Sequence, residues 1–408
     1  MSMNFIDVIK SRESLAQVAH PDELQEHLKT GSRTAYAGFD PTAESLHVGN
    51  LMPIMALRRW QQTGNKAVVL MGGATAMIGD PSGKSEMRQL ITEDVIDQRI
   101  TLLSKQFSRF LSPDPSKFAI VNNAQWFRPM QYLPLLREIG ADFTVNRMLA
   151  AECFKQRYEK GLSFLEFNYM ILQSYDFLHL NRTMGVTVQI GGDDQWSNMI
   201  GGMDLIRRKE RKQAFIVTNP LLVTSSGAKM GKTEKGAVWL NPDMTSPFEL
   251  FQYFRNVEDE MVEKCLFYFT DIPPDDVRSL GRAKDAKIND SKITLAFEVT
   301  KLVHGEDDAR KARDQAANLF SGGGGDAPQV SIDRSVFGES MNVVDFLVAA
   351  KICDSKGDAR RLIEQGGVTV DDEKISDLKK VLVLKLFEGG NSVLVRKGKK
   401  HFFKVCLT

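Results

Sequence analysis

Short apolar runs rich in β-branched residues recur along the first half of the chain, separated by stretches with helical spacing of apolar residues. The runs are TAYAGF (34 to 39), KAVVLM (66 to 71), KFAIV (117 to 121), VTVQI (186 to 190) and AFIVT (214 to 218). Strands that alternate with helices form right-handed crossovers and a parallel sheet with helices on both faces. The pattern therefore predicts a doubly wound, Rossmann-like α/β domain over residues 1–240, whose ligands lie at the carboxyl ends of the strands.

The pattern changes after this domain. Residues 247–320 carry apolar residues at helical spacing and no convincing strand, so we expect an α-helical domain. The glycine-rich stretch SGGGGDAPQ that follows has no strand before it and opens no helix, which favours a flexible linker, placed over 321–340, over a phosphate-binding loop. Residues 341–408 read as two helices and then short strands, a small α+β domain.

Composition adds little to this picture. The 408 residues include 53 Lys and Arg against 52 Asp and Glu, so total charge indicates neither a nucleic-acid nor a membrane partner. No apolar run approaches membrane-spanning length, and the first fifteen residues lack the apolar core of a signal peptide. The four cysteines include no CxxC pair, which argues against a zinc or redox motif. We expect a cytoplasmic protein with no membrane partner.

Local charge differs near the C-terminus, where basic and aromatic side chains are interleaved. They are Arg396, Lys397, Lys399, Lys400, His401, Phe402, Phe403 and Lys404. A solvated strand end would carry the same residues. Basic groups beside aromatic rings also suit phosphates and unstacked bases, and we favour a small RNA-binding module.

Two polar stretches predict a phosphate-bearing ligand. HVGN (47 to 50) follows the first strand and lies where a helical pattern begins; Gly49 lets a ligand approach the backbone there, and the helix N-terminus favours anions. SSGAKMGKTEKG (225 to 236) places Lys229 and Lys232 among glycines and serines. Alone it would be a solvated loop, but beside HVGN it can bring ammonium groups onto a polyphosphate.

Other polar groups follow strands or lie on a buried helix. In GGDDQW, Gly191 and Gly192 allow close approach of a ligand at a strand end. In FNYMILQSYDFL, the polar residues Tyr169, Gln173 and Asp176 fall at i, i+4 and i+7, so they share one side of an otherwise apolar helix. A buried polar stripe needs partners, which are either an internal hydrogen-bond network or a substrate.

HVGN resembles the HIGH signature, and KMGKT the KMSKS signature, of class I aminoacyl-tRNA synthetases. With GFDPTAESLHVGN, IGDPSGKS, YMILQSYDF and QIGGDDQW in order, nearly the whole chain resembles tyrosyl-tRNA synthetases of the bacterial type, and its C-terminal segment is similar to the S-four RNA-binding domain. The chain departs from the signatures at Asn50, which replaces a His, and at Gly231 and Thr233, which replace serines. We expect activity to survive, since an amide still donates a hydrogen bond, and the loop to be looser.

The resemblance implies an enzyme that activates L-tyrosine with ATP and Mg²⁺ and transfers it to tRNA(Tyr), acts as a homodimer, and holds no tightly bound metal of its own. It implies that Tyr169 and Gln173 hold the substrate ammonium, while Asp176 and Tyr36 meet the phenolic hydroxyl. The full set implied for tyrosine is Tyr36, Asp80, Tyr169, Gln173, Asp176 and Gln195. Asp80 has a second interpretation, as the cap of the turn before Pro81.

Two further sets follow from the resemblance. Residues implied for ATP and the adenylate are Gly38, Asp40, Thr42, His47, Gly49, Asn50, Gln189, Gly191, Gly192, Asp194 and Lys232. Residues implied in catalysis are Thr42, His47, Asn50, Lys84, Arg88, Lys229, Lys232 and Thr233. By the resemblance, Lys84 and Arg88 lie on a loop that would close over pyrophosphate. An equally good interpretation is that both are ordinary surface charges.

The sequence allows three competing interpretations. IGDPSGKS looks like a P-loop, but Gly79 and Gly83 are separated by only three residues where a Walker sequence requires four, and Ile78 stands where Gly should be. A non-catalytic RNA-binding protein on the same scaffold would have no use for the substrate contacts retained here. A tryptophan-specific relative is disfavoured because Tyr36 and Asp176 suit a phenol.

The apolar segment 126–149 fits either a dimer interface or core.

Overall fold

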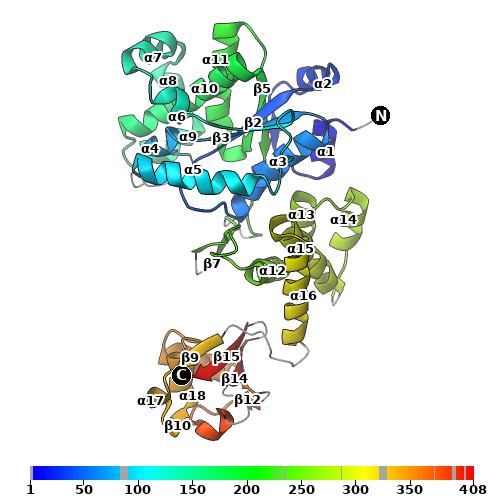
Figure 1. The fold of residues 1–408 in the computed structure, drawn as a ribbon, viewed down its shortest axis with the longest axis vertical. Coiled ribbons are helices and arrows are strands. Elements are labelled where there is room, and N and C mark those ends of the chain that lie inside the picture. Colours follow the sequence, from blue (N-terminus) through cyan, green and yellow to red (C-terminus); the bar gives the residue numbers. More distant parts are fainter. Residues whose placement is uncertain are drawn as a thin grey trace. The chain divides into compact units, whose positions relative to one another are not determined.

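The computed structural model forms two compact units, residues 1–309 and 310–408, which are described separately (Figure 1). The residues described are 3–82, 91–225, 227, 229–233, 236–285, 287–320, 329–371, 373–387, 392–398 and 401–408. No helix in this described part of the chain is both long and apolar enough to cross a membrane.

The first unit is built on a sheet of six strands in the order β1-β6-β5-β2-β3-β4. The strands are β1 (Gln17–Val18), β2 (Thr34–Phe39), β3 (Lys66–Met71), β4 (Phe118–Asn122), β5 (Val186–Gly192) and β6 (Phe215–Asn219). All neighbours pair in parallel except β1, which runs antiparallel to β6. The five parallel strands coincide with the five predicted apolar runs, because a parallel sheet covered on both faces needs continuous apolar strands. The predicted doubly wound α/β fold is confirmed.

Helices cover both faces of this sheet (Figure 1). They are α1 (Phe5–Ser11), α2 (Pro21–Lys29), α3 (Leu51–Gln62), α4 (Thr75–Ile78), α5 (Glu93–Phe107), α6 (Ala124–Phe127), α7 (Tyr132–Ile139), α8 (Val145–Leu149), α9 (Glu152–Tyr158), α10 (Phe164–Met184) and α11 (Trp196–Glu210). The polar stripe lies on α10. This helix begins with a reciprocal capping box between Ser163 and Glu166, and it ends at Gly185, whose φ is +63°. A side chain at Gly202 would press on Phe177, so glycine lets α11 approach α10 closely.

The strand order fixes where the site lies. From β2 the chain proceeds to β3 and β4 on one side, and later returns to place β5 and β6 on the other. The carboxyl ends of β2 and β5 are therefore neighbours at a topological switch point, where open α/β sheets bind their ligands. HVGN follows β2 and GGDDQW begins within β5, so the fold brings these two predicted segments to one crevice.

The segment predicted to be helical is helical. It contains α12 (Pro247–Arg255), α13 (Asp259–Phe269), α14 (Pro274–Gly281), α15 (Lys287–His304) and α16 (Glu306–Phe320). The buried Arg59 of α3 donates to the carbonyl oxygens of Phe267 and Tyr268 at the end of α13, both at 2.7 Å, and Arg12 donates to that of Thr270 at 2.9 Å. Burial lowers the pKa of Arg59 to about 9. Two guanidinium groups thus satisfy the last carbonyls of α13 and join it to the sheet domain.

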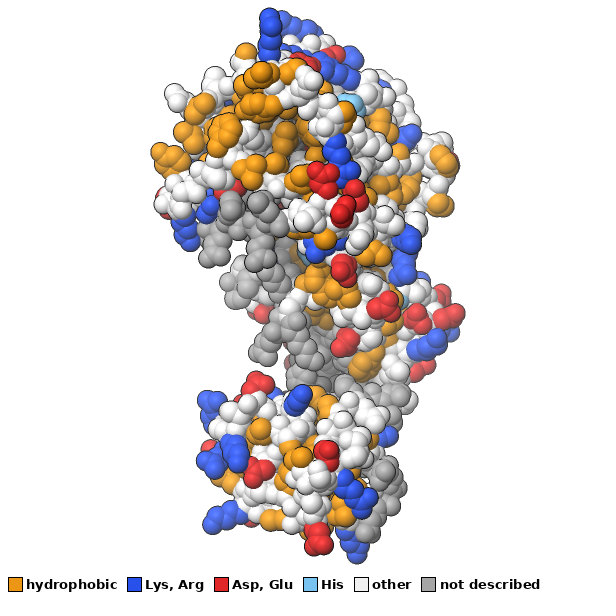
Figure 2. Space-filling model, turned by 60° about the vertical axis from the view of Figure 1, so that its left-hand side comes forward, with side chains coloured by type: hydrophobic (Ala, Val, Ile, Leu, Met, Phe, Trp, Pro, Cys, Tyr) orange, Lys and Arg blue, Asp and Glu red, His pale blue; other side chains and the backbone are white. Residues whose placement is uncertain are grey.

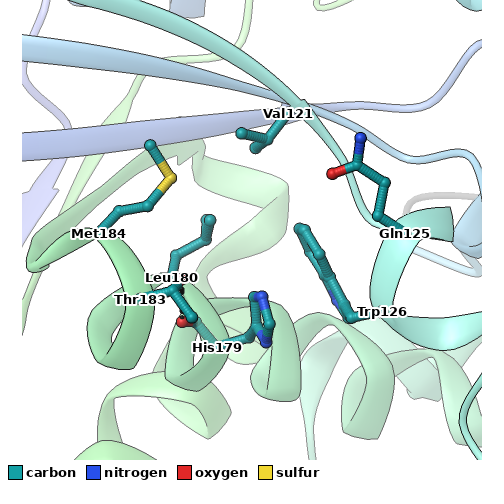
Figure 3. Close-up of a pocket in the computed structure, with 7 residues that line it drawn as sticks. All are labelled: Val121, Gln125, Trp126, His179, Leu180, Thr183 and Met184. Atoms are coloured by element: carbon teal, nitrogen blue, oxygen red, sulfur yellow. Dashed lines mark hydrogen bonds between the residues drawn. The ribbon is translucent and has the colours of Figure 1, made fainter.

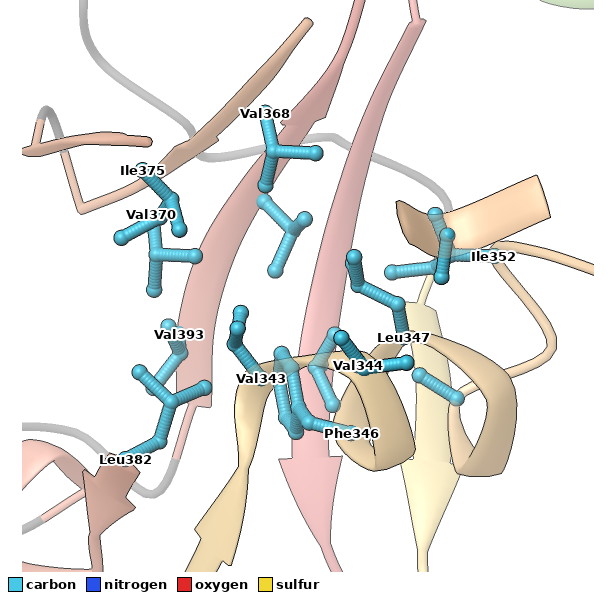
Figure 4. Close-up of a cluster of buried hydrophobic side chains, with 14 of the residues drawn as sticks. Val343, Val344, Phe346, Leu347, Ile352, Val368, Val370, Ile375, Leu382 and Val393 are labelled. Atoms are coloured by element: carbon cyan, nitrogen blue, oxygen red, sulfur yellow. The ribbon is translucent and has the colours of Figure 1, made fainter. Parts of the chain in front are cut away.

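The second unit, residues 310–408, contains the small α+β domain predicted over 341–408. A five-stranded sheet has the order β12-β11-β14-β15-β9, and a pair joins β10 to β13. Its elements are β9 (Gln329–Ile332), α17 (Arg334–Phe337), β10 (Ser340–Asn342), α18 (Val343–Ala349), α19 (Lys356–Glu364), β11 (Val368–Val370), β12 (Glu373–Ile375), β13 (Val381–Val383), β14 (Ser392–Lys397) and β15 (His401–Leu407). Apolar side chains of α18 and of the strands form one core between them (Figure 4).

The prediction of a flexible linker over 321–340 is wrong for residues 329–340, which form β9, α17 and the start of β10. β9 pairs in parallel with β15, Ile332 is buried, and the ring of Phe337 packs edge-on against Phe346. The strand escaped prediction because its four residues gain their hydrogen bonds from the last strand of the chain, and such long-range pairing leaves little trace in a local pattern. Residues 321–328 lie outside the described part of the chain.

Candidate active site

A carboxylate on α10 forms the centre of the predicted tyrosine pocket. Asp176 is 2% exposed; its Oδ1 accepts from Trp126 Nε1 at 2.9 Å and its Oδ2 from Asn123 Nδ2 at 3.0 Å. Burial raises the pKa of Asp176 to about 8, against the two hydrogen bonds, which lower it. Sequence reasoning did not assign Asn123 or Trp126 to the site.

Tyr36 lies in the middle of β2 and supplies the second predicted contact. Its hydroxyl is buried and has no hydrogen-bond partner among the described residues, while its ring packs against Phe177, 5.3 Å between centroids. Burial raises the pKa of Tyr36 well above its usual range, and the charge of Asp176 raises this pKa further, so the two groups are neighbours. An unpaired phenol beside a carboxylate offers one donor and one acceptor to a further hydroxyl group.

A hydrogen-bond chain joins this carboxylate to the far end of the stripe. Tyr169 donates to Asp40 Oδ2 at 3.1 Å, Thr75 donates to Asp40 Oδ1 at 2.9 Å, and Asn123 Nδ2 lies 3.1 Å from Thr75 Oγ1. Asn123 also holds Asp176, as described above. A side chain at Gly72 would clash with the Asp40 carboxylate, so this turn requires glycine. Asp40, predicted to contact ATP, is therefore held beside Tyr169.

Two amides in the same region have unpaired oxygens. Gln173 lies between Tyr169 and Asp176 on α10, and its Oε1 is buried with no partner in the described part of the chain; the same holds for Gln189 Oε1. Gln189 is the β5 neighbour of Tyr36, so the two side chains share one face of the sheet. Unpaired buried acceptors are costly in a folded protein and are expected where a polar ligand binds.

Asp80 and Gln195 meet across the ends of β3 and β5. Gln195 Nε2 donates to Asp80 Oδ2 at 2.7 Å, while Asp80 Oδ1 accepts from the backbone N–H of Ser82 at 2.9 Å. Asp80 thus caps its turn and also reaches across to the GGDDQW segment. A Cβ at Gly191 would lie 3.0 Å from Met199 Sδ, and one at Gly192 would lie 2.7 Å from Asp194 Oδ1, so a larger residue at either position would displace that side chain.

HVGN forms the first turn before α3. The backbone N–H of His47 donates to Asn50 Oδ1 at 2.9 Å, which leaves the Nδ2 group of Asn50 to donate elsewhere. A Cβ at Gly49 would lie 2.9 Å from the His47 ring, so glycine makes room for the imidazole.

KMGKT packs directly on HVGN. Gly231 has φ +85°, and a Cβ there would lie 3.4 Å from both the Gly49 nitrogen and Val48 Cβ. Its carbonyl accepts from the N–H of Val238 at 2.8 Å, and its own N–H donates to the Tyr253 hydroxyl of α12 at 2.8 Å. The glycine that replaces the signature serine is thus the residue type that this left-handed backbone favours.

Lys229 brings a positive charge to the GGDDQW end of the site. Burial raises the pKa of the Asp194 carboxyl; Lys229 opposes this rise and Asp80 adds to it. The three residues are therefore electrostatic neighbours. The sequence assigned Asp194 to the adenylate and Lys229 to pyrophosphate, and in the structure the Lys229 charge acts on the Asp194 carboxyl.

The remaining predicted residues are placed less fully. Thr42 is exposed, and its carbonyl accepts from Arg99 at 3.0 Å; Gly38 is an exposed strand position with nothing within 4 Å of where a Cβ would lie. Lys232 and Thr233 form β7 (Lys232–Thr233), which pairs with β8 (Gly236–Ala237). Lys84 and Arg88 lie outside the described residues.

Over the described part of the chain, no group of three or more His, Cys, Asp or Glu side chains is arranged to hold a metal ion.

Comparison with known proteins identifies the family of the chain. Residues 28–321 match the family model of class I tRNA synthetases (W and Y), which covers more than half of the chain. The chain belongs to this class I tRNA synthetase family. Residues 320–405 match the tyrosine–tRNA ligase SYY-like C-terminal domain.

Relatives of the family are similar over their full length. The chain is 48% identical over 409 residues to a tyrosine–tRNA ligase of Clostridium tetani, covering 100% of both, and 48% identical over 405 residues to one of Caldanaerobacter subterraneus, covering 99% of both. Among solved structures, a C-terminally truncated mitochondrial tyrosyl-tRNA synthetase of Aspergillus nidulans aligns with a TM-score of 0.70 at 28% identity, over 78% of this chain and 94% of that one. The family resemblance predicted from the signatures is confirmed.

The buried carboxylate of the site predicts a pH dependence of stability. The pKa of Asp176 rises from 3.8 to about 8 on folding, so the folded chain binds the proton more tightly than the unfolded chain. Between these values the free energy of unfolding should fall as pH rises, by at most about 1.4 kcal/mol per pH unit from this group. Urea unfolding from pH 5 to 8 should show a smaller decline for Asp176→Asn than for the wild type, whatever the absolute stability of the variant. Equal declines would show that Asp176 titrates normally.

The hydrogen bond between α12 and the KMGKT loop gives a second prediction. Tyr253→Phe removes the acceptor of the Gly231 N–H, so the loop should hold its position against HVGN less often. We expect the rate of adenylate formation to fall about twofold to tenfold, with the KM for the amino acid unchanged, in a stopped-flow assay. Tyr268→Phe, which deletes a hydroxyl from neighbouring α13, is the control. A lowered amino-acid affinity with an unchanged rate would contradict this assignment.

Proposed function

We propose that the chain is a tyrosine–tRNA ligase, which joins L-tyrosine to ATP and then to the 3′-terminal ribose of its tRNA. The observation that carries this proposal is the buried, unpaired hydroxyl of Tyr36 beside the Asp176 carboxylate. The phenol of tyrosine would donate to Asp176 and accept from Tyr36. Phenylalanine would leave both groups desolvated and unpaired, and it would be rejected for that reason. The names of the full-length relatives point to the same substrate.

The other end of the pocket suits the substrate ammonium. Asp80, Tyr169, Gln173 and Gln195 offer a carboxylate, a phenol and two amides, and Gln173 Oε1 is unpaired. An ammonium group donates three hydrogen bonds and carries the charge that a carboxylate favours. In this assignment Asp40 does not contact the ammonium group. It orients Tyr169 by accepting a hydrogen bond from the Tyr169 hydroxyl.

ATP would bind on the exposed side of the strand ends. The nucleotide can approach the backbone at Gly38, where nothing lies within 4 Å of where a Cβ would be, and at the glycines of GGDDQW. Gln189 and Asp194 lie next to these glycines in the sequence. His47, Asn50 and Thr42 would contact the phosphates at the N-terminus of α3. Lys229, Lys232 and Thr233 would bind the pyrophosphate, together with Lys84 and Arg88. Mg²⁺ would arrive on ATP as part of the substrate.

The reaction needs no protein nucleophile. The carboxylate oxygen of tyrosine attacks the α-phosphorus of ATP in line, the bond to the bridging oxygen breaks, and pyrophosphate leaves with the electron pair. The ribose hydroxyl of tRNA(Tyr) then attacks the activated carbonyl, and AMP leaves. Catalysis comes from positioning and from positive charge where negative charge develops.

The other parts of the chain would serve the tRNA. We propose that the helical domain over 247–320 lies on the anticodon side and that the C-terminal domain, with its basic and aromatic β14 and β15, contacts RNA backbone and bases. A cytoplasmic location fits these partners.

An apolar surface supports a homodimer. Tyr132, Leu133, Leu136 and Val145 on α7 and α8 are 54%, 74%, 45% and 57% exposed. Figure 2 shows hydrophobic side chains gathered over the upper part of this face of the first unit. A cluster of large apolar side chains marks a protein interface more often than free surface. The cluster lies in the segment that the sequence left open between interface and core.

The decisive experiment measures exchange of radiolabelled pyrophosphate into ATP without RNA, with tyrosine, phenylalanine and tryptophan side by side. Tyrosine should support exchange and the other two should not. Tyr36→Phe keeps the ring but deletes the hydroxyl, so the KM for tyrosine should rise about threefold to tenfold and the preference over phenylalanine should shrink. Absence of exchange with any amino acid would instead favour a non-catalytic RNA-binding protein, and preference for tryptophan would overturn the substrate.

The apolar cluster gives a prediction for assembly. Sedimentation of the wild type at micromolar concentration should show a dimer, and Leu133→Asp should shift it toward monomer because a charge would be buried in the interface. Leu102→Asp, on α5 and 43% exposed, is the matched control and should leave the dimer intact. A wild-type monomer would remove the dimer from the proposal.

A further inference from the structure

A cavity of about 230 Å³ borders Trp126, the residue that donates to the Asp176 carboxylate. Its lining comes from the end of β4, from α6 and from the last turns of α10, and consists of Val121, Gln125, Trp126, His179, Leu180, Thr183 and Met184. Figure 3 shows these side chains around the open space, with Trp126 and His179 facing each other.

The indole of Trp126 lines the cavity and also contacts Asp176. Its edge donates from Nε1 to Asp176 Oδ1 at 2.9 Å. Its face stacks on the imidazole of His179, with ring centroids 4.2 Å apart and an interplanar angle of 21°. Asp176 and His179 are three residues apart on α10, so one helix face presents both contacts to the same ring.

The open space makes this stack important. In a close-packed core, neighbours on every side fix the orientation of a ring. Trp126 is half-buried and borders the cavity, so packing does not block its movement on that side. His179 covers the indole there. Without the imidazole, the ring can turn toward the cavity and withdraw its N–H from Asp176.

We propose that His179 is a positioning residue for tyrosine recognition: by stacking on Trp126 it fixes the indole N–H that orients the Asp176 carboxylate toward the substrate hydroxyl. This inference rests on the proposed function and deepens it. It assigns a role to a side chain that does not itself reach the substrate.

The charge of His179 agrees with this role. Burial lowers the pKa of its imidazole, and the nearby Arg182 lowers it further, so the ring is neutral at neutral pH. The neighbouring Tyr175 ring, 6.3 Å away, adds no charge under those conditions. The contact with Trp126 is therefore a stack between uncharged rings, which places no cation beside Asp176.

The test uses the full-length chain in the pyrophosphate exchange assay. His179→Ala should raise the KM for tyrosine about threefold to tenfold and reduce the preference for tyrosine over phenylalanine, while kcat and the KM for ATP stay within about twofold. His179→Phe restores an aromatic face and should return the KM to near the wild-type value. His179→Leu keeps volume without an aromatic face and should behave like His179→Ala, which maintains the test if the alanine variant does not fold.

A double-mutant cycle separates positioning from general destabilisation. Trp126→Phe keeps a ring but deletes the N–H, so it should raise the KM for tyrosine by itself. In that background His179→Ala should add little, because the route from His179 to Asp176 is already broken. Independent, multiplying effects on the KM would overturn the proposal.

Met184→Ala is the matched control on the same helix. It also removes side-chain atoms from the cavity wall but leaves the stack in place, so the KM for tyrosine should not change. If Met184→Ala raised the KM for tyrosine as much as His179→Ala does, loss of packing would explain the effect of both variants. Exchange by the wild type with no effect of His179→Ala would refute this inference alone, whereas no exchange by the wild type would refute the proposed function.

Discussion

The site depends on keeping one carboxylate inside the protein. Asp176 is almost wholly buried, and burial raises its pKa to about 8 because a charge there lacks water. Hydrogen bonds from Asn123 and Trp126 offset part of that cost and fix both oxygens. A carboxylate held in this way has a defined direction in which it can accept a further donor, and the unpaired Tyr36 hydroxyl lies in the same region.

The parallel sheet supplies the partners of this carboxylate from separate strand ends. Asp40 follows β2, Thr75 follows β3 and Asn123 follows β4, and hydrogen bonds link them in series between Tyr169 and Asp176 on α10. A helix alone cannot satisfy a polar stripe that it buries. The strand ends do so here, and the same bonds fix the helix relative to the sheet. Fold stability and the shape of the pocket therefore rest on the same contacts.

Sequence reasoning succeeded where a local pattern carries the information. The five parallel strands were found because each is a continuous apolar run, and the stripe on α10 because helical spacing exposes it. Asn123, Trp126 and Thr75 were missed, since their importance arises only when strand ends meet. Gly72 and Gly73, directly after the second apolar run, repeat the paired glycines of GGDDQW and so mark the turn that holds Asp40. β9 was missed because its partner strand is some seventy residues away.

The helical segment contacts the end of the sheet domain that carries the proposed site, and it does so by two routes. Arg59, on α3, binds the last carbonyls of α13, and α3 itself begins directly after HVGN. Tyr253, on α12, accepts the N–H of Gly231, which packs against Gly49. A displacement of α12 relative to α3 must therefore either break the Tyr253 bond or draw Gly231 away from HVGN. The position of the lysine-bearing loop is in this way set by the helical segment as well as by the sheet.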